Sequence, residues 1–345
     1  MNRLYPILSE PRFVEPLWGG QRLAPWLALP PPHPERLGEI WLVFDSNRVT
    51  NGPFAGKTIA EVVQAYGEAV VGTRSFARYG ADLPLLAKFI DAADRLSVQV
   101  HPDDEYAHTF EAHTGFHGKT EAWYILATEP GATVTLGVRA PVERTALAAA
   151  IADGTIEDLL AQQPVHAGDL VFVPAGTIHA INAGIMLFEI QQKSDLTYRL
   201  YDYNRRDART GQLRELHIEQ ALAVSRLEPA SASFLQPLPL DEQRELLVAC
   251  SSFALERWHV RGCLSATTDP GSLEILTVID GTMQLEWGSK TLTLQRGAAV
   301  LLPATLGEYR VEAAQGILLR SYIPDLPTLL ATVDNDTGVA PIVQW

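Results

Sequence analysis

Two pairs of segments in this chain repeat the same order of features. The first pair reads EAWYIL at residues 121–126 and AGDLVFVPA at residues 167–175. The second pair reads EILTVIDG at residues 274–281 and RGAAVLLPA at residues 296–304. Each copy runs from a β-rich segment through a glycine turn to a second apolar segment that ends in a Pro-Ala corner. Such short strands between turn signals are typical of small antiparallel β domains, so the repeat predicts two related ones.

The expected fold is therefore mainly β, with two cupin-like (jelly-roll) β-barrels and a few short helices. One helix start has a clear signal, because Thr58 precedes Glu61 at the spacing of a capping box. Helical spacing and good helix formers recur in two later stretches. Short helices are expected at residues 58–66, 141–161 and 216–222.

A group of polar residues stands on the strands of the first copy. Gln99 and His101 are two residues apart in an alternating β-rich run, so both leave the same face of a strand. Glu121 opens the first repeat, and His179 follows its Pro-Ala corner. A lone histidine usually makes an ordinary hydrogen bond. Two imidazoles, a carboxylate and an amide oxygen at positions that converge inside a barrel instead predict a divalent metal site, with this strand face buried in a pocket.

The second copy lacks this polar strand. No Gln-x-His pair precedes it, and Glu308 stands five residues after Pro303, whereas His179 stands five residues after Pro174. We therefore expect the second β domain to have lost the metal site and to be structural or a lid. A polar, proline-containing stretch at 227–243 has the composition of a linker. The predicted domains are 1–235, with the metal site, and 236–345.

Composition narrows the possible partners. The chain of 345 residues carries 27 Lys and Arg against 41 Asp and Glu, a net charge of −14. This excess of acid argues against nucleic acid as a partner but allows a small phosphorylated substrate, which needs only a few local cations. With no apolar leader at the N-terminus and no apolar run of about 18 residues, a cytoplasmic protein without a membrane partner is expected. Cys250 and Cys263 are too few for a cysteine-rich zinc site, and we expect buried free thiols.

A second polar cluster follows the first copy. Asp195 and Arg199 lie on one face of an extended segment, and Arg205 comes shortly after. On an exposed strand such residues form ion pairs of little energetic weight. Beside a metal pocket the two arginines can bind an oxyanion, because the guanidinium fork fits it. Lys88 and Lys119 are further cations close to the predicted pocket walls, with Lys119 two residues before the predicted glutamate ligand.

With these residues in view, the chain resembles the type I mannose-6-phosphate isomerases in their shorter bacterial form. The Gln-Val-His-Pro-Asp-Asp run at 99–104 is the most specific match, and the last hundred residues match only in β character. Ile181 departs from the pattern, because eukaryotic members carry an aromatic residue there. The matching segments are 18–20, 38–41, 83–92, 96–107, 118–123, 174–180 and 194–201.

The resemblance implies an aldose–ketose isomerase that interconverts mannose 6-phosphate and fructose 6-phosphate through a cis-enediol. It implies one Zn²⁺ per chain, with another divalent first-row metal possible. A hydroxide, a glutamate or Lys119 can each serve as the base. The implied metal ligands are Gln99, His101, Glu121 and His179. The implied catalytic residues are Arg199, as the active-site arginine, with Lys119 and Asp195 in supporting or acid–base roles. The implied substrate-binding residues are Ser97, Lys88 and Arg205, on the phosphate side.

Two other functions stay open at this point. The first is an isomerase or epimerase acting on a different phosphorylated sugar, because pocket shape depends on loops that the sequence does not place. The second is a non-catalytic sugar-binding cupin. The degenerate second copy favours it, and the presence of Lys119, Asp195 and Arg199 argues against it. The sequence does not indicate an oligomeric state.

Overall fold

A computed structural model describes residues 4–207, 210–230 and 234–332. By their internal contacts these residues form two compact units. Unit 1 holds residues 4–12, 41–87 and 235–332, and unit 2 holds the described residues of 13–40 and 88–234. Both units are discontinuous in sequence, and the last crossing between them falls at residues 234–235. The assignment of 1–235 and 236–345 as domains stays a prediction.

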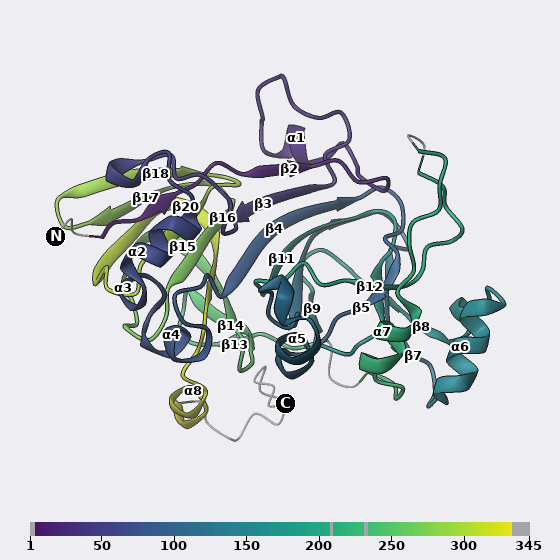
Figure 1. The fold of residues 1–345 in the computed structure, drawn as a ribbon. Coiled ribbons are helices and arrows are strands. Elements are labelled where there is room, and N and C mark those ends of the chain that lie inside the picture. Colours follow the sequence, from purple (N-terminus) through teal and green to yellow (C-terminus); the bar gives the residue numbers. More distant parts are fainter. Residues whose placement is uncertain (1–3, 208–209, 231–233, 333–345) are drawn as a thin grey trace. The chain divides into compact units, whose positions relative to one another are not determined.

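Unit 2 contains a five-stranded antiparallel sheet and most of a six-stranded one (Figure 1). The first sheet has the order β12 (Tyr198–Tyr201), β5 (Val98–Val100), β10 (His179–Ile181), β7 (Thr133–Val138), β8 (Leu160–Pro164). The second has the order β2 (Arg12–Val14), β3 (Glu39–Val43), β4 (Leu85–Ala92), β11 (Ile185–Gln192), β6 (Glu121–Thr128), β9 (Leu170–Val173). The helices of unit 2 are α1 (Leu23–Trp26), α5 (Asp104–Phe110), α6 (Arg144–Ala152) and α7 (Ile218–Val224), with short 3₁₀ turns at Ala112–Thr114 and Ile156–Leu159.

The core of unit 2 lies between its two sheets. One buried cluster joins Trp123 and Leu187 of the six-stranded sheet to Leu136 of the five-stranded sheet, so the sheets pack face to face. Val98 and Val100 belong to a second cluster, together with residues of α6 and α7, on the other face of the five-stranded sheet. The valines of β5 are therefore buried on this face, and Gln99, which points to the opposite face, is half-buried.

Unit 1 is built on one nine-stranded sheet. Its main path has the order β1 (Ile7–Leu8), β19 (Ala299–Leu302), β16 (Glu274–Asp280), β20 (Glu308–Tyr322), β15 (Ala254–Thr267), β14 (Arg244–Ala249), β13 (Leu238–Pro239). The hairpin of β17 (Thr282–Trp287) and β18 (Lys290–Gln295) joins it through β20. The helices of unit 1 are α2 (Ile59–Tyr66), α3 (Glu68–Val71), α4 (Thr73–Tyr79) and α8 (Leu326–Thr332), with a 3₁₀ turn at Gly52–Phe54.

The mainly β prediction is confirmed, and closed barrels are not observed, because the sheets of the described residues follow open paths. The capping box is confirmed: the Glu61 backbone N–H donates to Thr58 Oγ1 at 3.1 Å, and the Thr58 N–H donates to Glu61 Oε2 at 2.7 Å. The helix expected at 141–161 is too long. It ends at Ala152 because Gly154, with φ +72°, turns the chain, which then enters β8.

The repeat is visible in the strand pairing. In unit 2, β6 pairs antiparallel with β9 and brings Glu121 opposite Val173. In unit 1, β16 pairs antiparallel with β19 and brings Glu274 opposite Leu302. In each unit the glutamate at the start of the first strand is paired with the residue that precedes the proline of the Pro-Ala corner. Glu121 and Glu274 therefore occupy equivalent positions in the two copies.

Glu274 belongs to a buried ionic cluster. Arg320 lies 2.7 Å from Glu274 Oε1 through Nη2 and 3.0 Å from Glu256 Oε1 through Nη1. The hydroxyl of Tyr309 donates to Glu274 Oε2 at 2.7 Å, and Trp258 Nε1 donates to Glu256 Oε2 at 2.7 Å. Burial alone would lower the pKa of Arg320, but the two carboxylates outweigh it and hold that pKa well above its usual range. In unit 1 the guanidinium of Arg320 neutralises both glutamates.

Replacing Arg320 by methionine is expected to lower the free energy of unfolding by about 3–5 kcal/mol, because Glu256 and Glu274 would remain buried without a counter-charge. Urea unfolding followed by tryptophan fluorescence measures the change. Arg310→Met, at an exposed position of the same strand, is the matched control and should change stability by less than about 0.5 kcal/mol. Equal losses in the two variants would contradict the role given to the cluster.

The two cysteines differ in environment. Both are free, but Cys250 is buried and Cys263 is exposed, so the expectation of two buried thiols is wrong for Cys263. Burial raises the pKa of Cys250 to about 11. At pH 8 about one Cys250 thiol in a thousand would be ionised, and thiolate is the reactive form. A thiol reagent should therefore modify one cysteine per folded chain and none in Cys263→Ser. Rapid labelling of two sites without denaturant would contradict this placement.

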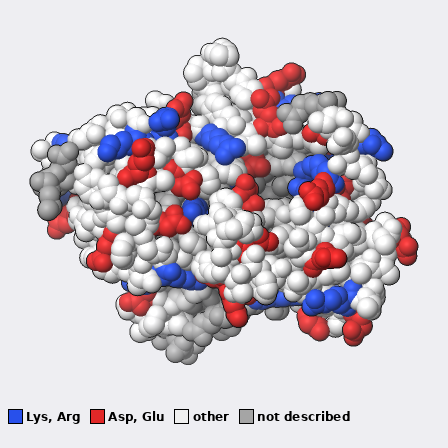
Figure 2. All heavy atoms as spheres, viewed as in Figure 1, with Lys and Arg blue, Asp and Glu red and all other residues white. Residues whose placement is uncertain are grey.

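On the face drawn in Figure 2, acidic and basic side chains are interspersed. Among the described residues no helix is long and apolar enough to cross a membrane.

Candidate functional site

Three of the predicted ligands meet in the interior of unit 2. His101 follows the end of β5, Glu121 opens β6 and His179 opens β10. Their side chains are at most 1% exposed. His179 Nε2 lies 3.2 Å from Glu121 Oε1, and His101 Nε2 lies 3.5 Å from Glu121 Oε2. One ligand atom from each residue can be chosen so that all lie within 4.8 Å of one another, which fits a single ion.

The hydrogen bonds of the two imidazoles prepare them to bind a metal. His101 Nδ1 lies 2.8 Å from the carbonyl oxygen of Leu196, and His179 Nδ1 lies 2.8 Å from that of Thr177. Because a carbonyl only accepts, each Nδ1 carries the proton in the neutral ring and each Nε2 presents a lone pair to the centre. His179 Nε2 and Glu121 Oε2 are buried without a hydrogen-bond partner among the described residues. Lone pairs that face one another in this way fit a shared cation.

Burial and nearby charges favour a neutral His101 and an ionised Glu121, the forms that bind a metal. Lys119 Nζ lies 3.3 Å from Glu121 Oε2 and 3.1 Å from His101 Nε2. Burial, followed by the charge of Lys119, holds the pKa of His101 well below its usual range. Burial alone would raise the pKa of Glu121, but Lys119 and the two histidines lower it well below its usual range. His101 is then neutral and Glu121 is ionised.

Gln99, the fourth predicted ligand, is half-buried on β5. In the strand pairing it stands directly opposite His179 on one side and Arg199 on the other. This places its backbone beside the buried group, and its role as a ligand stays a prediction.

Four further residues of the predicted site, two catalytic (Arg199, Asp195) and two substrate-binding (Ser97, Arg205), have three kinds of surroundings. Ser97 is buried and accepts a hydrogen bond from Arg199 Nε at 3.2 Å. Arg205 is held by carboxylates, with Nη1 3.1 Å from Asp94 Oδ2 and Nη2 2.5 Å from Asp202 Oδ1. Asp195 is exposed to solvent. The structure thus joins Ser97 to Arg199, engages Arg205 in ion pairs and leaves Asp195 on the surface.

Lys88 leads to a residue that the sequence analysis missed. Its Nζ lies 3.3 Å from Glu39 Oε2 and 3.2 Å from Glu189 Oε1. Burial and the charge of Glu121 raise the pKa of Glu189 to about 7, against the opposing charge of Lys88. A carboxyl group that changes protonation near neutral pH close to the possible metal ligands is a candidate acid–base residue. Its signal was available, because Glu189 is the one charged residue in the apolar run Ile185–Gln192.

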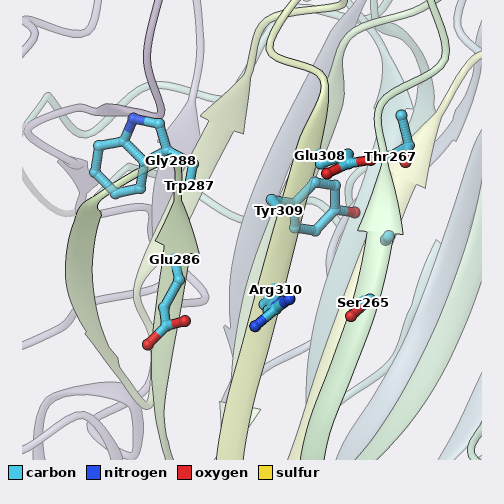
Figure 3. A pocket seen from close by; sticks show the side chains of 9 residues that line it. Ser265, Thr267, Glu286, Trp287, Gly288, Glu308, Tyr309 and Arg310 are labelled. Carbon is cyan, nitrogen blue, oxygen red and sulfur yellow. The ribbon is translucent and has the colours of Figure 1, made fainter.

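The cavity drawn in Figure 3 lies away from this chemistry. A cavity of about 540 Å³ in unit 1 lies over β15, β17 and β20, where Glu286, Arg310 and Ser265 stand on neighbouring strands (Figure 3). None of the predicted site residues lines it. We therefore locate the site by the buried side chains and not by cavity size.

Fold and site together define a class: a mainly β protein with a buried His-Glu-His centre able to hold a metal. Residues 9–131 match the family model for the phosphomannose isomerase type I catalytic domain, and residues 243–323 match that for the mannose-6-phosphate isomerase cupin domain. The chain belongs to the type I phosphomannose isomerases.

Relatives and solved structures agree with this membership. The mannose-6-phosphate isomerase ManA of Bacillus subtilis is 36% identical over 317 residues, covering 89% of this chain and 96% of the relative. That of Streptococcus mutans is 34% identical, with 89% and 95% covered. A crystal structure of mannose 6-phosphate isomerase from Bacillus subtilis superposes with a TM-score of 0.81 at 33% identity, covering 92% of this chain and 99% of that one.

Proposed function

We propose that this protein is an enzyme that interconverts mannose 6-phosphate and fructose 6-phosphate. The observation that carries the proposal is the buried group of His101, Glu121 and His179 in a chain similar over most of its length to proteins named mannose-6-phosphate isomerase. The alternative of a non-catalytic sugar-binding protein does not account for the similarity to proteins named as isomerases over 89% of this chain.

The proposed cofactor is one Zn²⁺ per chain, held by His101, Glu121 and His179 with Gln99 as fourth ligand. Two neutral imidazoles, a carboxylate and an amide oxygen suit Zn²⁺, and another first-row divalent metal fits the same donors. A bound ion would act as a Lewis acid on the carbonyl group of the sugar and so would make the adjacent C–H more acidic.

The chain's own residues have to move one proton between C2 and C1. In the proposed route Glu189 takes the proton from C2 of the open-chain aldose, which leaves a cis-enediolate. A proton then moves from O2 to O1, and Glu189 returns its own proton to C1 to give the ketose. Lys119 supplies positive charge beside the buried group. Arg199, held by its hydrogen bond to Ser97, stabilises the negative charge that develops on the sugar oxygens.

Lys88, Ser97 and Arg205 are proposed for the phosphate side. Arg205 has two carboxylate partners, so it would share its guanidinium between them and the substrate. The exposed position of Asp195 suits a supporting role at the rim better than proton transfer. The finer fold proposal is that each unit corresponds to one cupin-type barrel, the second without a metal. The proposed location is the cytoplasm.

A coupled assay with mannose 6-phosphate, with and without a chelator, tests this function. We expect turnover in the metal-loaded protein, a loss of at least about a hundredfold after metal removal, and recovery when Zn²⁺ is restored. A panel of other phosphorylated sugars checks the substrate. Full activity in protein shown to be free of metal would contradict the proposal, as would tight sugar binding with no turnover.

A further inference from the structure

The segment that carries Lys119 lies outside the regular sheet. Strand β6 begins at Glu121, and its pairing with both β9 and β11 starts at that residue. Lys119 is nevertheless 6% exposed and within 3.3 Å of both Glu121 and His101. Strand pairing does not hold residues 118–120, so other contacts must set the position of this lysine.

Asp104 supplies one of these contacts. It is the first residue of α5, but the cap of that helix is Asp103, whose Oδ1 accepts from the Tyr106 N–H at 2.9 Å. Oδ1 of Asp104 instead accepts from the backbone N–H of Gly118 at 2.9 Å and from Nε2 of Gln192 at 2.7 Å. The carboxylate is therefore directed at the Lys119 segment and not at its own helix.

Gln192, the last residue of β11, supplies the next contact and is 2% exposed. Its Oε1 accepts from the Thr120 N–H at 3.0 Å, and its own backbone N–H donates to the Thr120 carbonyl at 3.2 Å. Between them, the Lys119 N–H donates to the carbonyl of Pro102 at 2.9 Å. Three consecutive backbone N–H groups thus end on three different partners.

Gly118 closes the arrangement. A Cβ atom at this position would lie 2.4 Å from the carbonyl carbon of Asp103 and 2.5 Å from the backbone nitrogen of Asp104. Backbone atoms cannot move aside as a flexible side chain can, so only glycine fits. The segment lies directly against the start of α5, and a small displacement of either would carry the other with it.

We propose that Asp104 and Gln192 are positioning residues that hold the segment 118–121, so that Lys119 and Glu121 meet at the buried group in working geometry. The inference rests on the proposed function for its catalytic consequence, but its effect on metal binding does not. Partners that orient a ligand are typically worth about 10–100-fold in metal affinity or activity.

The test uses Asp104→Ala, which removes both acceptor contacts, and Gln192→Leu, which removes the amide at similar size. Gln162→Leu is the matched control. Gln162 lies on β8 and donates through Nε2 to Thr135 Oγ1 of β7 at 2.9 Å, away from the segment 118–121. We expect the first two variants to lose about 10–100-fold in Co²⁺ affinity, measured by chelator competition, and a similar factor in kcat. The control should match the wild-type protein.

A charge exchange separates positioning from general destabilisation. Gln192→Glu alone sets a second carboxylate against Asp104 and should weaken Co²⁺ binding. Adding Asp104→Asn restores a donor and an acceptor in exchanged places and should recover most of the affinity. If Asp104→Ala does not fold, the Co²⁺ affinities of these two proteins still test whether Asp104 and Gln192 position the segment.

Three results would overturn the inference. One is Co²⁺ affinity and kcat within twofold of wild type in both single variants. A second is a lower Tm of the metal-free variants with unchanged Co²⁺ affinity, and the third is no recovery in the exchanged pair. If the wild-type protein binds Co²⁺ but does not isomerise mannose 6-phosphate, the proposed function fails while the Co²⁺ comparison still tests the positioning.

Discussion

Replacing Glu121 by glutamine is expected to lower kcat/KM for mannose 6-phosphate by about a thousandfold. The substitution keeps the size of the side chain but removes the only carboxylate of the buried group. The lost metal affinity withdraws a Lewis acid worth several kcal/mol, and about 4 kcal/mol corresponds to a factor of 10³. Lys119 would at the same time lose the carboxylate 3.3 Å from its Nζ. Metal content and steady-state kinetics on the same preparation measure both effects.

Glu129→Gln is the control for this variant. Glu129 directly follows strand β6, which Glu121 opens, and its exposed carboxylate lies 3.8 Å from Arg22. It should retain metal and activity. A Glu121→Gln protein that keeps stoichiometric metal and more than a tenth of the wild-type rate would remove Glu121 from the ligand set.

Replacing Glu189 by glutamine is expected to lower kcat by about 10²–10⁴-fold while the protein keeps its metal, because the base for the proton transfer is lost. The pKa of about 7 belongs to the metal-free protein, and a bound divalent cation lowers the pKa of a nearby carboxyl, so the wild-type rate should fall with decreasing pH at values below 7 as Glu189 becomes protonated. The metal content and a pH profile of kcat/KM for both proteins measure these effects. An unchanged profile or less than a tenfold loss in Glu189→Gln would assign the base to another residue.

Stability gives a second readout for Glu189. Its pKa of about 7 in the folded metal-free protein lies above that of an unfolded glutamate, so the protonated form is favoured by folding. The stabilising contribution is complete below the unfolded pKa and is lost as the pH rises through about 7. Glu189→Gln should lack this part of the slope of unfolding free energy against pH. Identical slopes in metal-free wild type and variant would place the carboxyl in a less buried environment.

The group of His101, Glu121 and His179 could be predicted from sequence. Strand alternation and the position of the Pro-Ala corner indicate which side chains share one face of a strand. His101 stands in an alternating run, Glu121 opens the repeat and His179 follows its corner, and all three lie in the interior. Asp195 shows the limit of the same reasoning. Alternation places it on one face with Arg199, but it does not tell which face is covered, and Asp195 is exposed.

Glu189 was missed for a related reason. It stands in a strand that is buried throughout, and burial by two layers removes the alternation that would mark an inward polar residue. Its role depends on Lys88, which is distant in sequence but 3.2 Å away in the structure. The helix expected at 141–161 failed because composition favours a helix over the whole stretch, whereas the backbone turn at Gly154 ends it.

Glu121 and Glu274 occupy equivalent positions, but the positive charges beside them come from different sources. Unit 1 neutralises Glu274 with Arg320, which is part of the same chain. In unit 2 Lys119 lies 3.3 Å from Glu121, and the metal proposed for this group would come from solution. Its binding to the native state alone would add about 2.7 kcal/mol at a free metal concentration one hundred times the Kd. The thermal resistance of unit 2 should therefore follow metal supply, and that of unit 1 should not. When the metal is scarce, unit 2 should become open to proteolysis first.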